Sequence, residues 1–189
     1  AREKVRNEHS LDWKGFSEML RATPPGNNGS IMFPWFEAEI TPDVRTPGVR
    51  RVDLAAGDKA RNVRAVVEAQ MMALANHSRW MGVEVDVIHA TGGAAVNTDI
   101  LQVLADVFEA KVRRFKVTNS ACLGAALRAY HAEATANGSG LSWEKVVDGI
   151  AVPVAESPIM PKQSSVKTYT RLRRRYAKLE PLAISGCSD

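Results

Sequence analysis

The sequence has little cysteine and no long apolar run, and each of these absences excludes a class of protein. Only Cys122 and Cys187 occur among its 189 residues. Two cysteines so far apart give no disulfide framework and no cysteine-based zinc site, so we expect a reducing, cytoplasmic environment. No stretch approaches the roughly 20 apolar residues of a membrane-spanning helix. The charged residues at positions 1–4 lead into no apolar signal-peptide core, so we expect neither membrane insertion nor secretion.

The remaining composition is that of a soluble globular protein with an excess of positive charge. Hydrophobic residues make up 45% of the chain and charged residues 24%, and a length of 189 residues fits one domain or a large piece of one. The net charge is +4, but the basic residues are dense only at 171–175. Because Leu172, Tyr176 and Leu179 give this segment an apolar helical side, we expect a solvated helix face and no nucleic-acid partner.

Apolar periodicity predicts a mixture of helices and strands. Spacings of three and four residues predict helices over residues 10–21, with Ser10 as cap, and over 58–80, 98–108, 120–136, 142–150 and 162–179. Alternating or β-branched runs predict strands over 30–33, 83–89 and 111–117, the second of them buried, and residues 35–47 are predicted as a loop. The middle of the chain therefore runs strand, turn, helix, strand, helix, which predicts an α/β layer with parallel pairing.

The turn at residues 91–97 carries the clearest chemical signal. Gly92 and Gly93 lack Cβ atoms, so the backbone there can approach a ligand closely. The helix that begins near Asn97 would direct free amides and the positive end of its dipole into the same space, which favours phosphate. The segment is neither a Walker loop nor a complete dinucleotide fingerprint. From the glycines alone, a plain tight turn is the competing interpretation.

The sequence around this turn contains an ordered series of short motifs. His-Ala-Thr-Gly-Gly-Ala-Ala-Val-Asn at 89–97 is followed by Leu-Gln-Val-Leu-Ala-Asp-Val-Phe at 101–108 and by Ala-Cys-Leu-Gly-Ala-Ala-Leu-Arg-Ala at 121–129. Upstream come a Pro-Gly to Phe-Pro stretch at 25–34 and Glu-Ala-Glu-Ile-Thr-Pro at 37–42. In this order the motifs resemble the ATP-binding segment of the FGGY family of carbohydrate kinases and the sequence around it.

This resemblance implies an α/β fold, the two-lobed, ribonuclease H-like fold shared by actin, Hsp70 and hexokinase. Residues 1–189 would be the C-terminal, nucleotide-binding lobe of a sugar kinase, incomplete at its N-terminal end, with ATP in the cleft between the lobes. Carried over by motif, Gly92, Gly93 and Ala94 lie against the nucleotide, and Asn97 forms a hydrogen bond toward the adenine. Asparagine is also well suited to capping a helix, so Asn97 has two candidate roles.

The resemblance also implies that this chain does not phosphorylate a sugar alone. Phosphoryl transfer needs a base for the hydroxyl proton, a metal on the phosphates and the positioning of both substrates. In the family, the base aspartate, most sugar contacts and the metal-associated aspartate belong to the N-terminal lobe, and no matching segment occurs here. We therefore expect Mg²⁺ to arrive with ATP, and we expect no catalytic residue and no identifiable metal ligand in this chain.

The partners follow from the same resemblance. A partial lobe exposes a sheet edge and an apolar surface, so we expect it to associate with a second copy or with the missing half of the protein. Overall similarity within the family favours D-xylulose as the sugar, converted to xylulose 5-phosphate. The alternative is a non-catalytic binding or regulatory module that keeps the nucleotide-lobe fold.

Other residues near the motifs are interpreted as structural. We expect the small residues at 124–126 to pack their helix closely on a sheet. Glu37 and Glu39 resemble a family segment near the lobe interface and are not expected to be catalytic. Ile40 stands where the family usually has arginine, which puts an ion pair expected there in doubt. We expect His89, at a strand end, to be packed or hydrogen-bonded rather than to act as a base.

Overall fold

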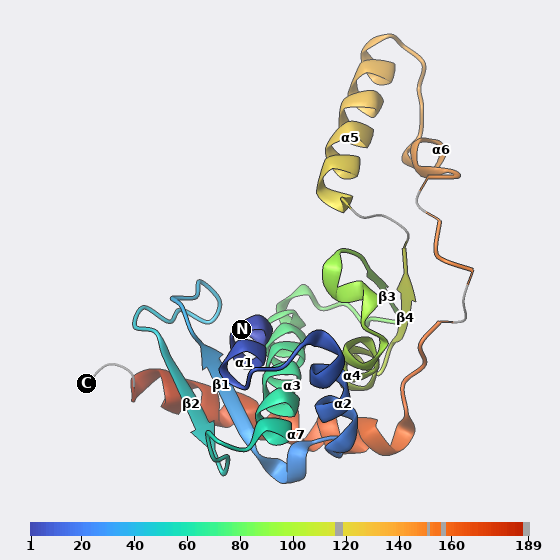
Figure 1. The fold of residues 1–189 in the computed structure, drawn as a ribbon. Helices are drawn as coiled ribbons and strands as arrows, with labels where there is room; N and C mark the ends of the chain where they lie inside the picture. The colour runs from blue at the N-terminus through green and yellow to red at the C-terminus, as the bar shows by residue number, and fades with distance from the viewer. Residues whose placement is uncertain (116–118, 151, 156–157, 187–189) are drawn as a thin grey trace.

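The computed structural model describes residues 1–115, 119–150, 152–155 and 158–186 (Figure 1). Its helices are α1 (Arg2–Glu8), α2 (Trp13–Ala22), α3 (Lys59–His77), α4 (Thr98–Phe108), α5 (Ser120–Ala136), α6 (Trp143–Val147) and α7 (Gln163–Ser185). Its strands are β1 (Ile31–Trp35), β2 (Gly48–Val52), β3 (Val87–Ala90) and β4 (Lys111–Arg114). Short 3₁₀ helices are η1 (Asn27–Gly29), η2 (Arg79–Met81) and η3 (Gly93–Val96).

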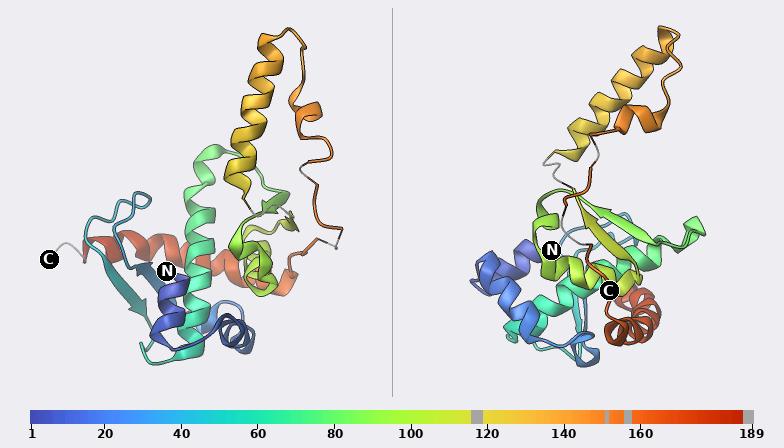
Figure 2. Two further views of the ribbon diagram at one scale, coloured as in Figure 1. Left: turned by 45° about the horizontal axis from the view of Figure 1, so that its top comes forward. Right: turned by 90° about the vertical axis from the view of Figure 1, so that its right-hand side faces the viewer.

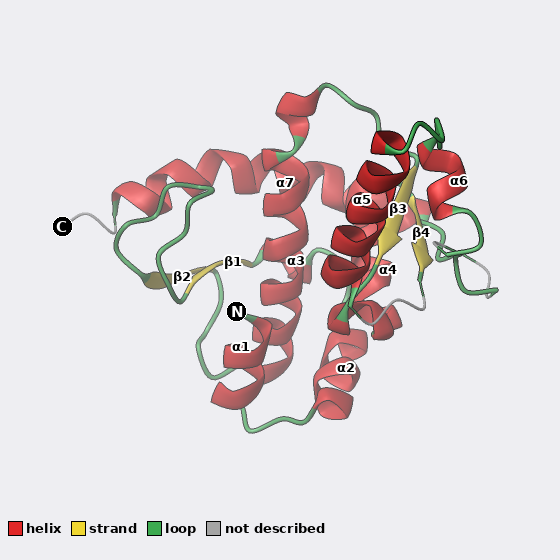
Figure 3. Ribbon diagram, turned by 90° about the horizontal axis from the view of Figure 1, so that it is seen from above, coloured by secondary structure: helices red, strands yellow, loops and turns green. Residues whose placement is uncertain are grey.

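Helix α3 runs through the centre of the folded body, as the views from the side and from above show (Figures 1 and 3). It packs against α1, α2, α4, α7 and β1. Asp58 begins the helix by accepting a hydrogen bond from Arg61 N at 3.1 Å. Val63, Val66 and Val67 are fully buried. Because these valines are three and four residues apart, their side chains lie on one face of α3 and pack against the neighbouring elements. Their burial contributes to the main hydrophobic core.

Strands β1 and β2 form an antiparallel hairpin that covers one side of this core. They pair along their full lengths, and every residue of β1 is buried. The ring of Phe33 lies 5.1 Å from the ring of Trp35 and 4.7 Å from the ring of Tyr176 on α7. Aromatic contacts at such distances stabilise beyond the area they bury, so they hold α7 against the hairpin.

A buried polar network joins α2, α3, α7 and the turn that follows α2. Glu68 Oε1 accepts hydrogen bonds from Gly26 N and from the Tyr169 hydroxyl, each at 2.8 Å. Arg64 lies 3.7 Å from Glu68 and donates to two backbone oxygens at the C-terminal end of α2, both at 2.6 Å. Burial raises the pKa of Glu68 to about 7, although Arg64 acts in the opposite direction. The network therefore contains a carboxyl group that folding favours in its protonated form.

Strand β3, helix α4 and strand β4 form a parallel β–α–β unit, as the sequence predicted. The parallel pairing starts with Val87 opposite Lys111. Ile88 and Ala90 pack against the core, whereas Val87 and His89 are exposed. The prediction that this strand is buried was therefore wrong. Within the described residues this sheet has two strands, and only one of its faces is covered.

Other boundaries differ from the predictions for local reasons. Helix α1 and strand β2 were not predicted, because α1 buries only Val5 and β2 is partly exposed along its length. Asp12 rather than Ser10 caps α2, and its Oδ1 accepts a hydrogen bond from Gly15 N at 2.6 Å. Helix α3 ends before the predicted limit because η2 follows it, α6 is shorter than predicted, and α7 is longer. Residues 116 and 117, the last two of the strand predicted over 111–117, lie outside the described part.

The basic cluster at 171–175 is not wholly a solvated face. Two of its arginines are exposed. Arg173, however, donates to the backbone oxygen of Val107 at 3.1 Å, and Arg175 donates to the backbone oxygen of Gly29. The predicted solvated face was therefore wrong for these two side chains, which attach α7 to the body.

Residues 119–150, which include α5 and α6, project from the rest of the structure and are called the arm below (Figures 1 and 2). The body is the part formed by residues 1–115 and 158–186. All residues of the arm are described, and only Val146 among them is buried. A Cβ atom built on Gly124 would meet no atom within 4 Å. The expected close packing of residues 124–126 on a sheet was therefore wrong. Helix α5 packs on α6, and no described strand lies against it.

Candidate functional site

The predicted site residues lie at the corner where β3 ends and α4 begins. Gly92 has a φ of 80°, a left-handed conformation that glycine adopts without strain. Its carbonyl accepts a hydrogen bond from Ala95 N at 3.0 Å. Gly93 follows directly and begins η3. A Cβ atom built on either glycine would meet no atom within 4 Å, so the backbone at this corner is open to an incoming group.

Asn97 closes the corner as the N-cap of α4. Its Oδ1 accepts hydrogen bonds from Asp99 N and Ile100 N, both at 3.1 Å. Its Nδ2 donates to Ser17 Oγ of α2 at 2.8 Å. The capping role is confirmed, and it occupies two first-turn amides that the sequence analysis expected to be free. Since an amide nitrogen carries two hydrogens, the bond to Ser17 uses one of them, and the contact with adenine stays a prediction.

A cavity of about 530 Å³ lies beside this corner and is bounded by residues of α1, α2, α3 and α4. Its volume is in the range of small-molecule sites. It is lined by Ala1, Arg2, Glu3, Trp13, Gln70, Gly93, Val96, Asn97 and Ile100. The structure thus brings Gly93 and Asn97 to one cavity. Gly92 lies next to its wall, and the side chain of Ala94 lies outside the described part of the structure.

Several cavity residues were missed by sequence reasoning because only the tertiary fold places them there. Trp13 begins α2 and is 46% exposed, and the guanidinium of Arg6 lies 4.6 Å from its ring. Gln70 of α3 has a buried Oε1 for which the described residues supply no hydrogen-bond partner. Val96 is exposed. An indole ring, an aliphatic wall and a polar acceptor suit a flat nitrogen heterocycle. No local motif marks Trp13, which belongs to the apolar side of the predicted first helix.

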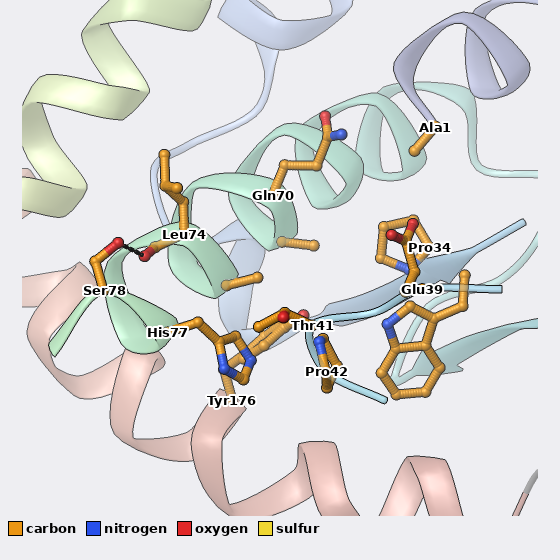
Figure 4. Close-up of a pocket in the computed structure, with 13 residues that line it drawn as sticks. Ala1, Pro34, Glu39, Thr41, Pro42, Gln70, Leu74, His77, Ser78 and Tyr176 are labelled. Carbon is orange, nitrogen blue, oxygen red and sulfur yellow. Dashed lines mark hydrogen bonds between the residues drawn. The ribbon is translucent and has the colours of Figure 1, made fainter. Parts of the chain in front are cut away.

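A second cavity, of about 420 Å³, lies next to the first and shares Ala1 and Gln70 with it (Figure 4). His77 and Tyr176 both line this cavity (Figure 4). His77 Nε2 is 3.0 Å from Glu180 Oε2, and burial together with the Glu180 charge raises the pKa of Tyr176. None of the described residues that line this cavity is a predicted nucleotide-site residue. Of these two cavities, only the first is therefore lined by residues of the corner.

The residues that the sequence analysis treated as structural have structural contacts. Glu37 accepts a hydrogen bond from Lys4 Nζ at 2.7 Å, and this bond lowers the pKa of Glu37. Glu39 forms backbone hydrogen bonds across the loop between β1 and β2. The ring of His89 is exposed but lies 4.7 Å from the ring of Phe115, so its contact is a partial ring contact and not the full packing expected for it.

Two further properties concern the described ranges only. Within them, no three histidine, cysteine, aspartate or glutamate side chains gather into a group that could hold a metal ion. None of the helices in these ranges has the length and apolar character that crossing a bilayer requires.

Comparison with known proteins identifies the family. The pattern of the C-terminal domain of the FGGY family of carbohydrate kinases matches residues 1–133. The chain belongs to this FGGY family. Among curated relatives, a xylulose kinase of Rattus norvegicus is 39% identical over 191 residues, which cover 97% of this chain and 35% of that protein. The chain thus spans about a third of the length of the curated relatives it matches.

Solved structures of FGGY kinases share the fold. A ligand-bound xylulose kinase from Lactobacillus acidophilus is 22% identical, with a TM-score of 0.75 over 93% of this chain and 36% of that one. A Plasmodium falciparum glycerol kinase with ADP is 18% identical, with a TM-score of 0.63 over 88% of this chain and 33% of that one. At these identities the likeness is one of fold. The predicted second lobe of an actin- and hexokinase-like kinase is thereby confirmed.

Proposed function

We propose that this chain is the nucleotide-binding lobe of an ATP-dependent sugar kinase that transfers the γ-phosphate of ATP to D-xylulose. Membership of the FGGY family supports the reaction class. The 39% identity with a rat xylulose kinase supports the sugar, and the product would be xylulose 5-phosphate. The choice of sugar rests on this similarity, because no residue of this chain is assigned to the sugar.

The observation that carries the proposal is that Gly93 and Asn97 lie on the wall of the 530 Å³ cavity. The adenine would enter between Trp13 and the aliphatic side chains of Val96 and Ile100, with Asn97 Nδ2 at its edge. The phosphates would run along the backbone at the glycine pair, since Asn97 already occupies amides of the first turn of α4. The glycerol kinase of the same fold was solved with ADP, which supports a nucleotide as a ligand of proteins with this fold.

The base, the sugar contacts and the metal ligands are assigned to the part of the protein outside this chain. Mg²⁺ bound to the phosphates would neutralise the charge that develops during transfer. This lobe would hold and orient the nucleotide, which lowers the entropic cost of bringing the γ-phosphate to the sugar hydroxyl. We propose that the rest of the protein, or a second copy, covers exposed apolar side chains such as Trp80, which is 85% accessible here.

The substitution Gly93→Val in the complete protein tests the nucleotide site. The backbone of Gly93 is not left-handed and the space around it is open. Because Gly93 lines the cavity, we expect valine to block close approach of a ligand to the backbone without straining the fold. We expect binding of a non-hydrolysable ATP analogue, measured by calorimetry, to weaken roughly tenfold or more, with an unchanged melting temperature.

Gly57→Val is the matched control, because Gly57 has equally open surroundings and an ordinary φ and does not line the cavity. Unchanged nucleotide affinity in a folded Gly93→Val protein would remove the glycine corner from the site.

The complete protein is also expected to phosphorylate D-xylulose in preference to ribulose and glycerol. Nucleotide binding without phosphorylation of any sugar would instead identify a non-catalytic module.

A further inference from the structure

Helix α2 contacts the first turn of α4 through two side chains on one of its faces. Ser17 and Arg21 are four residues apart, which places them on the same side of the helix. Ser17 Oγ accepts the hydrogen bond from Asn97 Nδ2 at 2.8 Å. One turn further along, Arg21 Nη1 donates to Asp99 Oδ2 at 2.5 Å. The two pairs hold the corner from outside, since neither Ser17 nor Arg21 lines the cavity.

The bond to Ser17 restricts the orientation of the Asn97 amide. The Cβ–Cγ torsion of asparagine is broad, so the two cap bonds to Oδ1 leave the amide plane some freedom. A third bond, from Nδ2 to an oxygen on a different helix, fixes both ends of the amide group. The second Nδ2 hydrogen then has a defined direction, which a group that recognises a ligand edge requires.

The bond to Arg21 controls charge at the same turn. Asp99 places a carboxylate on the first turn of α4, on the side that faces Arg21 and outside the lining of the cavity. Its negative charge would still act, through space, against phosphates bound at the corner. The guanidinium of Arg21 neutralises this carboxylate. The Arg21 side chain is 56% exposed and that of Asp99 is 25% exposed, so solvent screens the pair and its effect is smaller than that of Ser17.

We propose that Ser17 and Arg21 are positioning residues for the nucleotide corner, Ser17 by orienting Asn97 and Arg21 by compensating Asp99. This inference rests on the proposed function. Neither residue belongs to the glycine motif or to the cavity wall, and each acts through a residue of the first turn of α4.

The test compares variants of the complete protein by calorimetric binding of a non-hydrolysable ATP analogue and by steady-state kinetics. Ser17→Ala removes the acceptor while favouring the helix, since alanine has the higher helix propensity. We expect its nucleotide Kd and its KM for ATP to rise about two- to tenfold, the effect of one hydrogen bond, with kcat and the melting temperature unchanged. Ser17→Thr keeps a hydroxyl and is expected to bind like the unaltered protein.

Glu18→Ala is the matched control, because Glu18 is exposed on the same turn of α2 and does not line the cavity. Arg21→Gln is expected to weaken binding by less than Ser17→Ala, and the loss is expected to shrink as salt increases. Unchanged affinity in Ser17→Ala, while Gly93→Val weakens binding, would overturn the positioning role and leave the proposed function standing. Equal losses in Ser17→Ala and Glu18→Ala would also overturn it. Unchanged binding in Gly93→Val would overturn the proposed function itself.

Discussion

Helices α4 and α5 both begin with an asparagine cap, but α4 is buried and α5 is exposed. Asn97 caps α4, and Asn119 caps α5 by accepting a hydrogen bond from Cys122 N at 3.1 Å. Both helices span the residues predicted from the sequence, 98–108 and 120–136. Helix α4 buries most of its apolar side in the core, whereas α5, all of it described, buries no residue.

The difference teaches that capping and periodicity are enough to set the bounds of a helix but not its burial. Helix α4 is covered because α2, α3 and α7 pack around it. The alanine-rich α5 has small side chains that gain little from burial unless a surface lies directly against them. The body should therefore behave as one cooperative unit, and the arm as a region of lower stability.

The largest expected effect is in amide hydrogen exchange of the 189-residue chain. Amides of α4 are expected to exchange only through opening that costs about 5 kcal/mol or more, and those of α5 through local opening that costs about 2 kcal/mol or less. Mass-spectrometric exchange on peptides of the two helices measures this contrast. Equal protection of the α4 and α5 amides would contradict the expected difference in stability. Protection of the α5 amides that increases with protein concentration would show that a second copy covers the arm.

A core truncation should separate the two regions almost as strongly. Phe33 is fully buried against Trp35 and Tyr176, so Phe33→Ala is expected to reduce the free energy of unfolding by about 3–5 kcal/mol. Tyr130 of the arm is 56% exposed, and Tyr130→Ala is expected to change it by less than about 0.5 kcal/mol. Urea titration of both variants gives the result; similar losses for the two would contradict it.

The body, but not the arm, should also depend on pH through Glu68. Burial raises the pKa of this carboxyl from 4.5 to about 7, so its protonated form is favoured in the folded state. Its stabilising contribution is present below about pH 4.5 and is lost as the pH rises through 7, a change of about 3 kcal/mol at most. Glu68→Gln has no carboxyl to titrate.

Denaturation at pH 5 and pH 8 tests this dependence. We expect the free energy of unfolding of the unaltered chain to fall between the two values, and that of Glu68→Gln to fall less. An identical fall in both proteins would show that another group is responsible.

The smallest effect is expected within the arm. The rings of His131 and Trp143 stack with their centroids 4.1 Å apart, which joins α5 to α6. Trp143→Ala is expected to cost about 1 kcal/mol or less and to accelerate amide exchange in the arm while leaving the core unchanged. Trp80→Ala is the control, because Trp80 is exposed on the body. Destabilisation of the core by Trp143→Ala would show that the arm and the body unfold together.

The sequence by itself determined the features that depend on near neighbours in the chain. Signals within a few residues predicted the cap at Asn97, the bounds of α4 and α5 and the open backbone at Gly92 and Gly93. The order strand, helix, strand along the chain predicted the parallel β–α–β unit. Helix hydrogen bonds join residues four apart, and the conformational freedom of glycine is a property of one residue. The ordered motifs also identified the family.

Only the tertiary structure decided what surrounds these features. Ser17 reaches Asn97 across 80 residues of sequence, and Trp13 and Gln70 meet Gly93 at one cavity although each lies on a different element. Helix α1 and strand β2 carry too little apolar pattern to be predicted alone. Contacts between distant residues depend on how whole elements pack, and a local sequence pattern records which side of a helix is apolar but not what will cover it.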